Sequence, residues 1–574
     1  MRKFVVTLLL AAAACGQPPG ANPTASAPPA TGGPAWFEEI AARSGLVFRH
    51  RSGHETRHRL PEIMGGGAAL VDIDADGSLD IFLVQSGHLH PTTQSPRGGG
   101  PGLSGSPGTP AGHRLYRNRG DGTFEDVSGP SGIAAIAGYG MGIATGDYDS
   151  DGDMDVYLTN LGANVLLQND GRGRFADVTR AAGVSGSGWS TSATFADLDA
   201  DGDLDLFVTR YLDWRIEIER ECYSLTGLPD YCSPRNYDAP ASGLLFRNNG
   251  NGTFTDISRA AGLATAVGNG LGVIADDVNG DGRLDVFVAN DGTPNHLWMN
   301  LGQARFAESG LMSGVAIDQD GAPKAGMGVH AADVDDDGDN DLIVVNLDTE
   351  SDSFFRNSGR FFVDDTAGVG LRIASRRFTR FGVAFGDFDN DGQLDLYEAN
   401  GRVGLQAERF GPDPYAEPNL LLRGAAGGRF DEVNPRGGTA LPLVATSRAA
   451  AFGDIDNDGG LDIVVANRDG APYLLRNVAP ARGHWLLVRV VEASGRDAIG
   501  ATLSIAAGGR TIRRDVRTGY SYLAANDPRV HVGLGGLTTV ESITVRWADG
   551  TRERFGPFDA DRILEIRRGS SRTP

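Results

Sequence analysis

Positive charge is scarce in this chain, which has 52 lysine and arginine residues against 74 aspartate and glutamate residues and a formal net charge of −22. A protein this acidic repels phosphate groups, which argues against a nucleic-acid partner. Cysteine is rare, with three residues in 574. The apolar run at residues 4–14 is too short to span a bilayer. Glycine is abundant, with 82 residues, and only 22% of residues are charged, which favours many tight turns between short strands.

The N-terminus has the features of an export signal. Arg2 and Lys3 precede the apolar run, which ends in Ala12-Ala13-Ala14-Cys15. This ending resembles a bacterial lipobox, which implies lipidation of Cys15; an ordinary cleaved signal is the alternative. We expect a lipoprotein-type signal peptide over 1–15 and a flexible linker over 16–34. The mature protein is then exported, either lipid-anchored at the cell envelope (periplasmic or cell surface) or secreted.

The two remaining cysteines are Cys222 and Cys232. An exported chain meets oxidising conditions, so we predict a disulfide that closes one surface loop. A metal-binding pair is the weaker alternative, because no third cysteine or nearby histidine accompanies them.

An acidic motif, D-x-[DN]-x-D-G-x-x-D, occurs seven times along the chain. It begins at Asp72, Asp147, Asp197, Asp277, Asp333, Asp387 and Asp454. A glycine-rich segment precedes most copies, and an apolar strand such as DIFLV follows each one. A second strand with an LYRN-like core comes next, and a segment like Gly-Thr-Phe-x-Asp-Val usually closes the unit. Such a repeat of about four short strands, with a period of roughly 50–80 residues, is typical of a β-propeller blade.

The counts of these elements indicate how the ring closes. Seven acidic motifs and seven LYRN-like strands are present, but only six closing segments follow them. The missing segment is Trp36-Phe37-Glu38-Glu39-Ile40, so we predict that this N-terminal strand completes the seventh blade and leaves no open sheet edge. The expected fold is all-β, with a seven-bladed propeller over 35–480 and a small β-domain over 481–570. Insertions are expected at 86–112 and 211–242.

Each acidic motif is predicted to form a calcium site. If the loop curls, side chains at positions 1, 3, 5 and 9 point toward one centre and position 7 adds its backbone carbonyl, which gives an oxygen cage that suits Ca²⁺ better than Mg²⁺. Gly at position 6 permits the positive φ that the curl requires. An EF-hand is excluded, because position 12 is Glu only once and the flanks read as strands. A plain Asp-Gly turn needs only one or two of these residues.

The prediction is up to seven Ca²⁺ ions, with the Asp277 motif the weakest because Asn279 stands at position 3. Unpaired, the carboxylates repel one another, so metal binding is expected to be coupled to folding. The predicted ligands are Asp72, Asp74, Asp76, Ser78 and Asp80; Asp147, Asp149, Asp151, Asp153 and Asp155; Asp197, Asp199, Asp201, Asp203 and Asp205; Asp277, Asn279, Asp281, Arg283 and Asp285; Asp333, Asp335, Asp337, Asp339 and Asp341; Asp387, Asp389, Asp391, Gln393 and Asp395; and Asp454, Asp456, Asp458, Gly460 and Asp462.

These motifs resemble FG-GAP or VCBS-type repeats, as in the integrin α-subunit propeller. The match is closer to the cartilage acidic protein family and its bacterial relatives, in which F-x-[DE]-x-x-x-x-[AS]-G-L (here 37–46) leads to a glycine-rich run (here 65–67). Residues 484–567 resemble the ASPIC/UnbV domain that ends such proteins. The resembling stretches are DAIGA at 497–501, GY at 519–520, NDP at 526–528, HVGLG at 531–535 and VRWADG at 545–550, where Ala548 replaces the usual Pro. The resemblance implies an exported calcium-binding protein and no defined reaction.

One motif points elsewhere. The stretch Gly53-His54-Glu55-Thr56-Arg57-His58 contains H-E-x-x-H, the signature of zinc proteases. Such a protease needs the motif on a helix, whereas Gly53 precedes it, Pro61 follows it and no apolar face supports a helix over 51–62. We therefore expect a polar loop on one face of the propeller, with ligand recognition as an alternative role.

No other group of residues predicts catalysis, because Ser, His and Asp occur without a nucleophile-elbow motif. We expect a monomeric, non-enzymatic module that binds a protein or glycan at the cell envelope and touches the membrane only through its lipid anchor. The alternative is a calcium-dependent lyase or hydrolase acting on polysaccharide. Its catalytic base would come from Tyr, Lys or His on one face, such as His54, His58 or His330.

Overall fold

The computed structural model describes residues 33–89 and 112–571. The signal peptide, Cys15, nearly all of the linker and most of the 86–112 insertion lie outside these residues.

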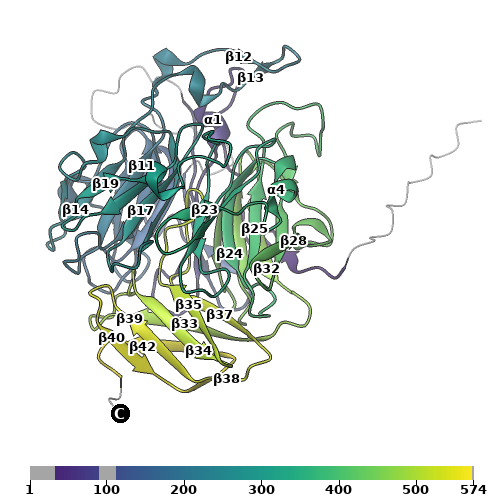
Figure 1. Ribbon diagram of the computed structural model, residues 1–574. Coiled ribbons are helices and arrows are strands. Elements are labelled where there is room, and N and C mark those ends of the chain that lie inside the picture. The colour runs from purple at the N-terminus through teal and green to yellow at the C-terminus, as the bar shows by residue number, and fades with distance from the viewer. Residues whose placement is uncertain (1–32, 90–111, 572–574) are drawn as a thin grey trace, which may run out of the picture.

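Seven antiparallel four-stranded sheets, blades 1 to 7, surround a common axis (Figure 1). From the innermost strand outward they are β2 (Ala68–Val71), β3 (Asp80–Leu83), β4 (Arg114–Asn118) and β5 (Phe124–Asp126); β6 (Tyr139–Gly146), β7 (Asp155–Leu161), β8 (Val165–Asn169) and β9 (Phe175–Asp177); β10 (Ser190–Ala196), β11 (Asp205–Arg210), β14 (Leu244–Asn248) and β15 (Phe254–Asp256); β16 (Gly270–Asp276), β17 (Asp285–Asn290), β18 (His296–Asn300) and β19 (Phe306–Glu308); β20 (Val329–Ala332), β21 (Asp341–Val344), β22 (Ser353–Asn357) and β23 (Phe362–Asp364); β24 (Arg380–Gly386), β25 (Asp395–Asn400), β27 (Leu420–Ala425) and β28 (Arg429–Glu432); and β30 (Ser447–Gly453), β31 (Asp462–Asn467), β32 (Tyr473–Asn477) and β1 (Phe37–Glu39).

The ring is closed in the way that the repeat count predicts. Each innermost strand contacts the next around the axis, and β30 of blade 7 contacts β2 of blade 1. Strand β1 is the outermost strand of blade 7, where Phe37 pairs with Asn477 and Glu39 with Leu475. The first and last blades are therefore joined by hydrogen bonds between the two ends of the repeat array.

Glycine in the innermost strands allows neighbouring blades to approach closely. A Cβ atom added at Gly272 of β16 would lie 2.3 Å from the carbonyl oxygen of Met327, and one at Gly328 would lie 2.0 Å from that of Phe381. Both distances are too short for any side chain. Farther from the axis, apolar side chains of adjacent blades pack together, as Phe82 of β3 does with the cluster that contains Val156 of β7.

The C-terminal domain is a sandwich of two packed sheets. One sheet has the order β37-β33-β42 and the other β35-β34-β39-β40. Both sheets contribute to one buried core, which includes Leu486, Ile505, Val532 and Trp547. The elements are β33 (His484–Val491), β34 (Thr502–Ala507), β35 (Arg510–Asp515), β36 (Ala524–Ala525), β37 (Val530–Gly535), β38 (Thr539–Val540), β39 (Ser542–Arg546), β40 (Arg552–Phe555), β41 (Phe558–Asp559) and β42 (Arg562–Arg567).

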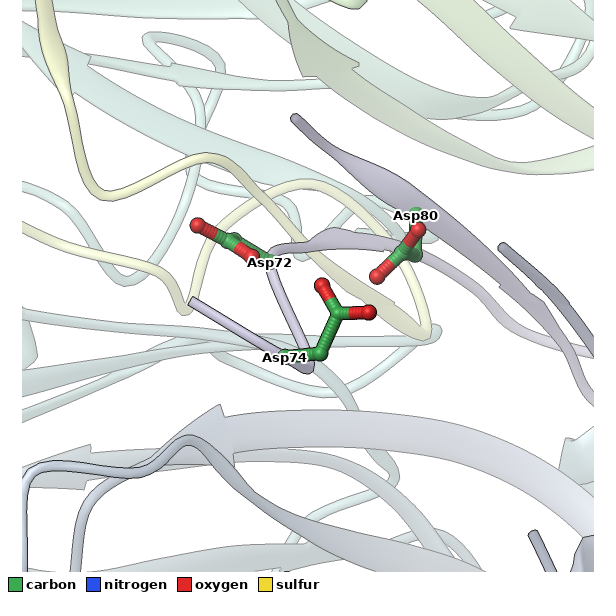
Figure 2. Close-up of side chains that lie close together, drawn as sticks. All are labelled: Asp72, Asp74 and Asp80. Carbon is green, nitrogen blue, oxygen red and sulfur yellow. The ribbon is translucent and has the colours of Figure 1, made fainter. Parts of the chain in front are cut away.

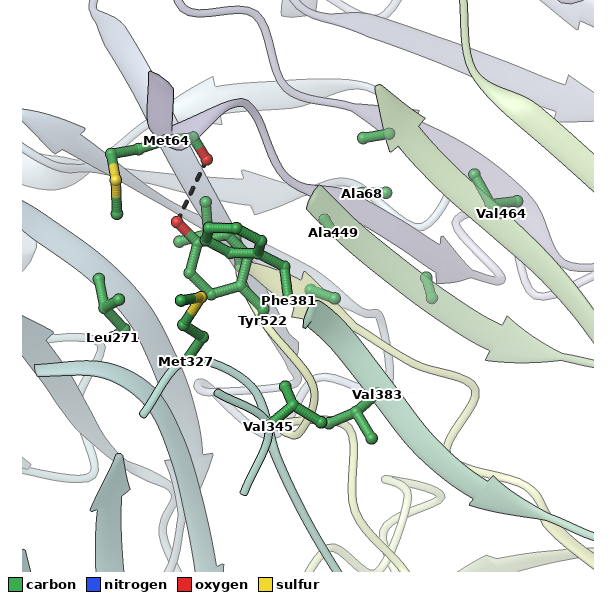
Figure 3. Close-up of a cluster of buried hydrophobic side chains, with 14 of the residues drawn as sticks. Met64, Ala68, Leu271, Met327, Val345, Phe381, Val383, Ala449, Val464 and Tyr522 are labelled. Carbon is green, nitrogen blue, oxygen red and sulfur yellow. Dashed lines mark hydrogen bonds between the residues drawn. The ribbon is translucent and has the colours of Figure 1, made fainter. Parts of the chain in front are cut away.

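A segment of this domain, residues 517–528, leaves the sandwich and enters the centre of the propeller; we call it the finger. Strand β36 of the finger pairs in parallel with β2, at Ala68 with Ala524 and Ala69 with Ala525. The Tyr522 ring is fully buried among the innermost strands, and its hydroxyl donates to the carbonyl of Met64 at 3.2 Å (Figure 3). The finger thus closes the central channel.

Short elements lie on the face of the propeller opposite the C-terminal domain (Figure 1). They include the hairpin of β12 (Cys222–Tyr223) with β13 (Pro229–Asp230), and the pair of β26 (Glu417–Pro418) with β29 (Val444–Ala445). The α-helices of the described residues are α1 (Pro61–Met64), α2 (Thr179–Ala182), α3 (Gly310–Ser313) and α4 (Leu371–Ala374). Over 33–89 and 112–571, no helix has the length and apolar character needed to cross a membrane.

Candidate functional site

The acidic motifs form the turns between the first and second strands of the blades, and the hydrogen bonds of the blade 1 turn recur around the ring. The position 1 carboxylate, Asp72, accepts from the backbone N–H groups of Asp76 and Gly77 at 3.2 and 2.9 Å. The position 9 carboxylate, Asp80, accepts from the N–H groups of Ile73 and Asn118 at 3.1 and 2.7 Å. Gly77 has a φ of 88°, as predicted for position 6. These bonds curl the loop and hold its first and last carboxylates in place.

The curl brings carboxylates together. In blade 1 the oxygens of Asp72, Asp74 and Asp80 lie within 4.8 Å of one another (Figure 2). Equivalent groups are Asp147, Asp149 and Asp155; Asp197, Asp199 and Asp205; Asp333, Asp335 and Asp337; and Asp387, Asp389 and Asp395. The predicted ligands at positions 1, 3 and 9 therefore converge in blades 1, 2, 3 and 6, whereas positions 1, 3 and 5 converge in blade 5. Each group could hold a cation.

Several oxygens in these loops are buried without a hydrogen-bond partner in the described part of the chain. They include one oxygen at position 3 in blades 1, 2, 3 and 5, namely Oδ1 of Asp74, Asp149, Asp199 and Asp335. A buried oxygen without a partner is costly unless a missing ligand satisfies it. The same position is left unsatisfied in four loops, which fits a bound cation at each.

Burial raises the pKa of the position 9 carboxyl in every blade. The pKa rises to about 8 for Asp80, about 9 for Asp155 and about 8 for Asp205, and the neighbouring loop carboxylates at positions 1 and 3 raise it further. Desolvation and like charges both disfavour the ionised form. The loops without an ion are therefore electrostatically strained, and a divalent cation would relieve this strain.

The remaining predicted ligands lie at the outer part of each loop. The position 5 carboxylate accepts from the position 7 backbone N–H, as Asp76 does from Ser78 at 2.8 Å and Asp151 from Asp153 at 3.0 Å. The same bond joins Asp201 to Asp203, Asp281 to Arg283, Asp337 to Asp339, Asp391 to Gln393 and Asp458 to Gly460. Position 7 thus supports the loop through its backbone.

Arginine side chains pair with acids of the blade 4 loop, as Arg356, Arg423 and Arg482 do with Asp335, Asp389 and Asp458 in blades 5, 6 and 7. Arg546 of the C-terminal domain donates to Oδ2 of Asp277 at 3.0 Å, and Arg283 pairs with Asp281. Asn279 donates to Asp281 at 3.0 Å. Cations of the protein itself therefore neutralise part of this loop.

An asparagine at the end of the LYRN-like strand links each loop to the next blade, a role that the sequence reading missed. Asn169 of blade 2 donates to the carbonyl of Ile73 in the blade 1 loop at 2.8 Å. Asn118, Asn248, Asn300, Asn357 and Asn477 make the same bond to Ile455, Tyr148, Leu198, Val278 and Phe388. Blade 6 has Gly424 at this position, where an added Cβ would lie 2.1 Å from the carbonyl oxygen of Leu394. The recurrence of Asn at the end of these strands was the sequence feature from which this role could have been predicted.

The C-terminal domain covers the face that carries the acidic loops. Arg496 donates to the carbonyl of Gly202 in blade 3 at 2.7 Å, and Arg513 donates to that of Gly338 in blade 5 at 2.8 Å. The backbone N–H of Gly535 donates to Asn390 of blade 6, and Arg529 donates to Asn457 of blade 7. A ligand of the propeller therefore has freer access from the opposite face.

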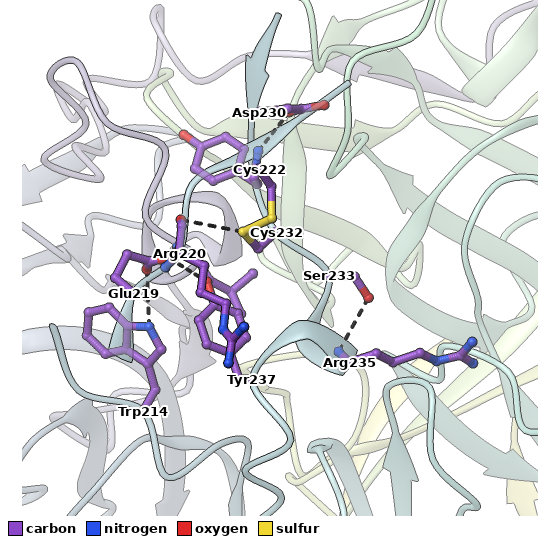
Figure 4. Close-up of a disulfide and its surroundings, with 11 residues drawn as sticks. Trp214, Glu219, Arg220, Cys222, Asp230, Cys232, Ser233, Arg235 and Tyr237 are labelled. Carbon is purple, nitrogen blue, oxygen red and sulfur yellow. Dashed lines mark hydrogen bonds between the residues drawn. A yellow bond between two sulfur atoms is a disulfide. The ribbon is translucent and has the colours of Figure 1, made fainter. Parts of the chain in front are cut away.

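That open face carries the H-E-x-x-H segment and the predicted disulfide. Cys222 and Cys232 are bonded with an S–S distance of 2.06 Å, and the bond ties the β12–β13 hairpin to the segment that holds Arg235 (Figure 4). Residues 53–58 form no helix, as expected, although Pro61 begins the single turn α1 that directly follows. The zinc-protease arrangement, with both histidines on one helix, is absent from this described segment.

The three histidines considered as alternatives for a polysaccharide enzyme lie on two different faces of the propeller. His54 and His58 lie together on the open face, with ring centroids 4.8 Å apart. His330 lies under the C-terminal domain, where its ring stacks on Tyr520 at 4.1 Å and its Nδ1 accepts from the N–H of Phe385. His330 is 8% exposed, because the finger covers it.

The open face also contains a pocket of about 300 Å³ directly above the plugged channel. Its wall is largely apolar and includes Leu271, Met327 and Phe381. Its polar groups include Asp291, whose Oδ2 accepts from the hydroxyl of Tyr211 at 2.6 Å. Burial raises the pKa of Asp291 to about 6. This combination of apolar walls with a few fixed polar groups is typical of a ligand pocket.

Comparison with known proteins agrees with the repeat structure. The FG-GAP-like repeat family matches residues 72–158, 147–208, 226–288, 277–344 and 333–398, and the family ASPIC and UnbV matches 491–573. Human cartilage acidic protein 1 is 26% identical over 321 residues, which cover 54% of this chain and 46% of the human protein. The Xenopus tropicalis protein is 27% identical over 307 residues, which cover 52% and 44%. The chain thus spans about half the length of these relatives.

Two solved structures give weak superpositions. Rhamnogalacturonan lyase PL11 of Bacillus licheniformis has a TM-score of 0.31 at 14% identity and covers 91% of this chain and 92% of its own. An Agrocybe aegerita lectin, described as recognising non-reducing terminal N-acetylglucosamine, has a TM-score of 0.35 at 15% identity and covers 70% and 86%. Similarity this weak carries no functional argument. The family matches, in contrast, cover most of the chain: it belongs to the FG-GAP repeat proteins that end in an ASPIC/UnbV domain, together with cartilage acidic protein 1.

Proposed function

We propose that this protein is an exported, calcium-stabilised β-propeller that binds a glycan or a protein through the face opposite its acidic loops. The two faces differ in accessibility, and this difference carries the proposal. The C-terminal domain covers one face and its finger closes the channel, whereas the other face has an open, ligand-sized pocket.

The acidic loops support calcium as the stabilising ion. Their donors are carboxylate and carbonyl oxygens, which are the ligands that Ca²⁺ prefers. Buried oxygens without partners and raised carboxyl pKa values recur from blade to blade, as a repeated ion site requires. Up to seven ions would bind, and the blade 4 loop, with Asn279 in place of an acid at position 3, would bind most weakly.

Export to an oxidising compartment is supported by the Cys222–Cys232 disulfide and by the signal-like N-terminus. Anchoring at the cell envelope through a lipid on Cys15 would leave the propeller in solution, as a monomer, with its open face available. The flexible linker over 16–34 would let that face turn toward a partner.

The pocket supports a ligand with both apolar and polar surface. Tyr211 and Phe381 offer aromatic surface, while Asp291, Glu350 and Arg235 offer charged hydrogen-bonding groups. Planar charged groups beside aromatic rings suit the hydroxyl-bearing and apolar faces of a sugar, and equally a peptide side chain. A volume of about 300 Å³ is at the lower end for ligand pockets, so the pocket would hold the end of a chain rather than a long segment.

The test is binding of the calcium-loaded mature protein to a glycan array and to envelope proteins. Arg235→Ala should weaken the binding found with the wild type, whereas Arg259→Ala, an exposed arginine outside the pocket, should not. Equal binding by both variants and by Asp291→Asn would refute the pocket. New reducing or unsaturated ends on a polysaccharide, lost in the pocket variants, would establish the enzyme alternative instead.

A further inference from the structure

The H-E-x-x-H segment brings two imidazole rings together without forming a helix. The ring centroids of His54 and His58 are 4.8 Å apart, with the planes tilted by 52°. Two imidazoles that bind one ion at ordinary metal–nitrogen distances have centroids about 5 Å apart, if the angle at the metal is close to tetrahedral. The spacing of the two rings is therefore already that of a shared ion.

The orientation of His54 is fixed by a buried carboxylate. Oε2 of Glu62 lies 2.8 Å from Nδ1 of His54, and Glu62 is fully buried. A carboxylate only accepts, so Nδ1 carries the proton, and in the neutral ring Nε2 has the lone pair. This carboxylate–histidine arrangement is the usual support of a metal-binding histidine. The hydroxyl of Tyr231 lies 3.3 Å from the same Nδ1 and also faces the cluster.

His58 supplies a second nitrogen without a partner. Its Nδ1 atom is buried and has no hydrogen-bond partner among the described residues. A buried nitrogen with no donor to accept from is an unmet requirement that a metal ion would satisfy.

Two arginines near the cluster are paired with acids. Arg59 lies 3.3 Å from Oε1 of Glu62, and Arg468 lies 3.2 Å from Oδ2 of Asp469. The charge of each of these two arginines is therefore compensated by a neighbouring carboxylate. The site is also separate from the calcium loops, because it lies on the opposite face of the propeller.

We propose that His54 and His58, with Glu62 orienting His54, bind one transition-metal ion of the Zn²⁺ or Cu²⁺ class. Imidazole nitrogen suits these ions, whereas Ca²⁺ prefers oxygen. Two protein ligands leave coordination positions for water or for an oxygen of a ligand. Tyr231 belongs both to this cluster and to the wall of the pocket, so the ion would lie at the rim of the pocket. This site does not depend on the function proposed above.

The test is titration of the calcium-saturated mature protein with Zn²⁺ against a chromophoric competitor. We expect one tight equivalent per chain, weakened at least about tenfold by His54→Gln and by His58→Gln. His484→Gln is the matched control, because Nδ1 of His484 makes the same type of pair with Oδ2 of Asp561, at 2.7 Å, in the C-terminal domain. Equal affinity in all four proteins would overturn the proposal, as would the absence of a stoichiometric site in the wild type.

A second measurement uses the unaltered protein and so does not depend on whether the variants fold. Electron paramagnetic resonance of the chain with one equivalent of Cu²⁺ should show coupling to two imidazole nitrogens. Coupling to oxygen ligands alone would refute a site at His54 and His58.

Discussion

Replacing Asp80 by Asn should change the stability of the protein in opposite directions with and without calcium. Asp80 is 1% exposed, and its two oxygens accept from Ile73 and Asn118. Burial raises the pKa of its carboxyl to about 8 in the ion-free chain. Asn has the same shape but no charge. The substitution therefore removes one ligand of the proposed calcium site and also a buried group whose ionisation is unfavourable when calcium is absent.

The size of the effect without calcium follows from the pKa. In the unfolded chain the carboxyl has a pKa of about 3.9 and is ionised at pH 7, while in the folded ion-free chain it is mostly protonated. The folded state thus binds more protons, so this group's contribution to stability falls as the pH rises from about 4 to about 8. At pH 7 the loss is about 4 kcal/mol. Asn avoids it but offers one acceptor fewer, at a cost of about 1–3 kcal/mol. The net expectation in chelator is stabilisation by about 1–3 kcal/mol.

With calcium at one thousand times the dissociation constant the sign reverses. An ion that binds only the folded state then stabilises it by about 4.1 kcal/mol, which exceeds the gain of about 1–3 kcal/mol from removing the charge. Loss of one carboxylate from Asp72, Asp74, Asp76 and Asp80 removes most of that term. The assay is urea denaturation at pH 7, in calcium and in excess EGTA. Asp256→Asn is the control, because Asp256 only accepts from Ser258 at an exposed turn. A change of the same sign in both media would refute a calcium site in blade 1.

Three further predictions concern the fold. Tyr522→Ala should lower the free energy of unfolding by about 3–5 kcal/mol in urea denaturation, because it leaves a cavity in the central channel. Tyr522→Phe loses only the hydrogen bond to Met64 and should lower it by about 1 kcal/mol. Equal losses in the two variants would contradict the role of the Tyr522 ring in closing the channel. Asn169→Ala should cost about 2–3 kcal/mol by the same assay, because it leaves the carbonyl of Ile73 without its donor, and a neutral result would remove the link between blades. Burial lowers the pKa of His113 to about 4 in the folded chain. Between pH 4 and 6.5 the unfolded chain therefore binds more protons at this residue than the folded chain does. The contribution of His113 to stability is lost as the pH falls through that range. The stability advantage of the wild type over His113→Gln should then shrink by about 2 kcal/mol between pH 7 and pH 4.5, and a constant difference would contradict the shift.

The propeller could be predicted because its information is local and repeated. Each blade has its own acidic turn, and the turn fixes the register of the strands on both sides, as Asp80 and Val71 pair across β2 and β3. Closure through β1 followed from counting, since one closing segment was missing and one stood at the front. Because the same motif occurs seven times, a misinterpretation of one copy does not change the predicted fold.

The finger could not be predicted, because its contacts are distant in sequence and have no period. Residues 517–528 carry no repeated pattern, yet Leu523 donates its N–H to Ser192 at 3.0 Å, and Oγ of Ser521 accepts from the N–H of Val383. The contact of His54 and His58 with Tyr231 could not be predicted for a related reason. Tyr231 lies far along the chain, on the disulfide segment, and only the closed ring brings it to His54 and His58.

The contacts of the C-terminal domain suggest that calcium and domain docking stabilise the same loops. Arg496, Arg513 and Arg529 donate to the backbone carbonyls of Gly202, Gly338 and Asp454, and not to the converging carboxylates of those loops. These arginines therefore recognise the curled backbone and leave the carboxylates for an ion. An ion that holds the curl presents the carbonyls in the position that the arginines require. Arg546 with Asp277 and Arg482 with Asp458 are exceptions, and the first occurs in the loop that has Asn279 at position 3. Removal of calcium should therefore loosen the C-terminal domain as well as the blades.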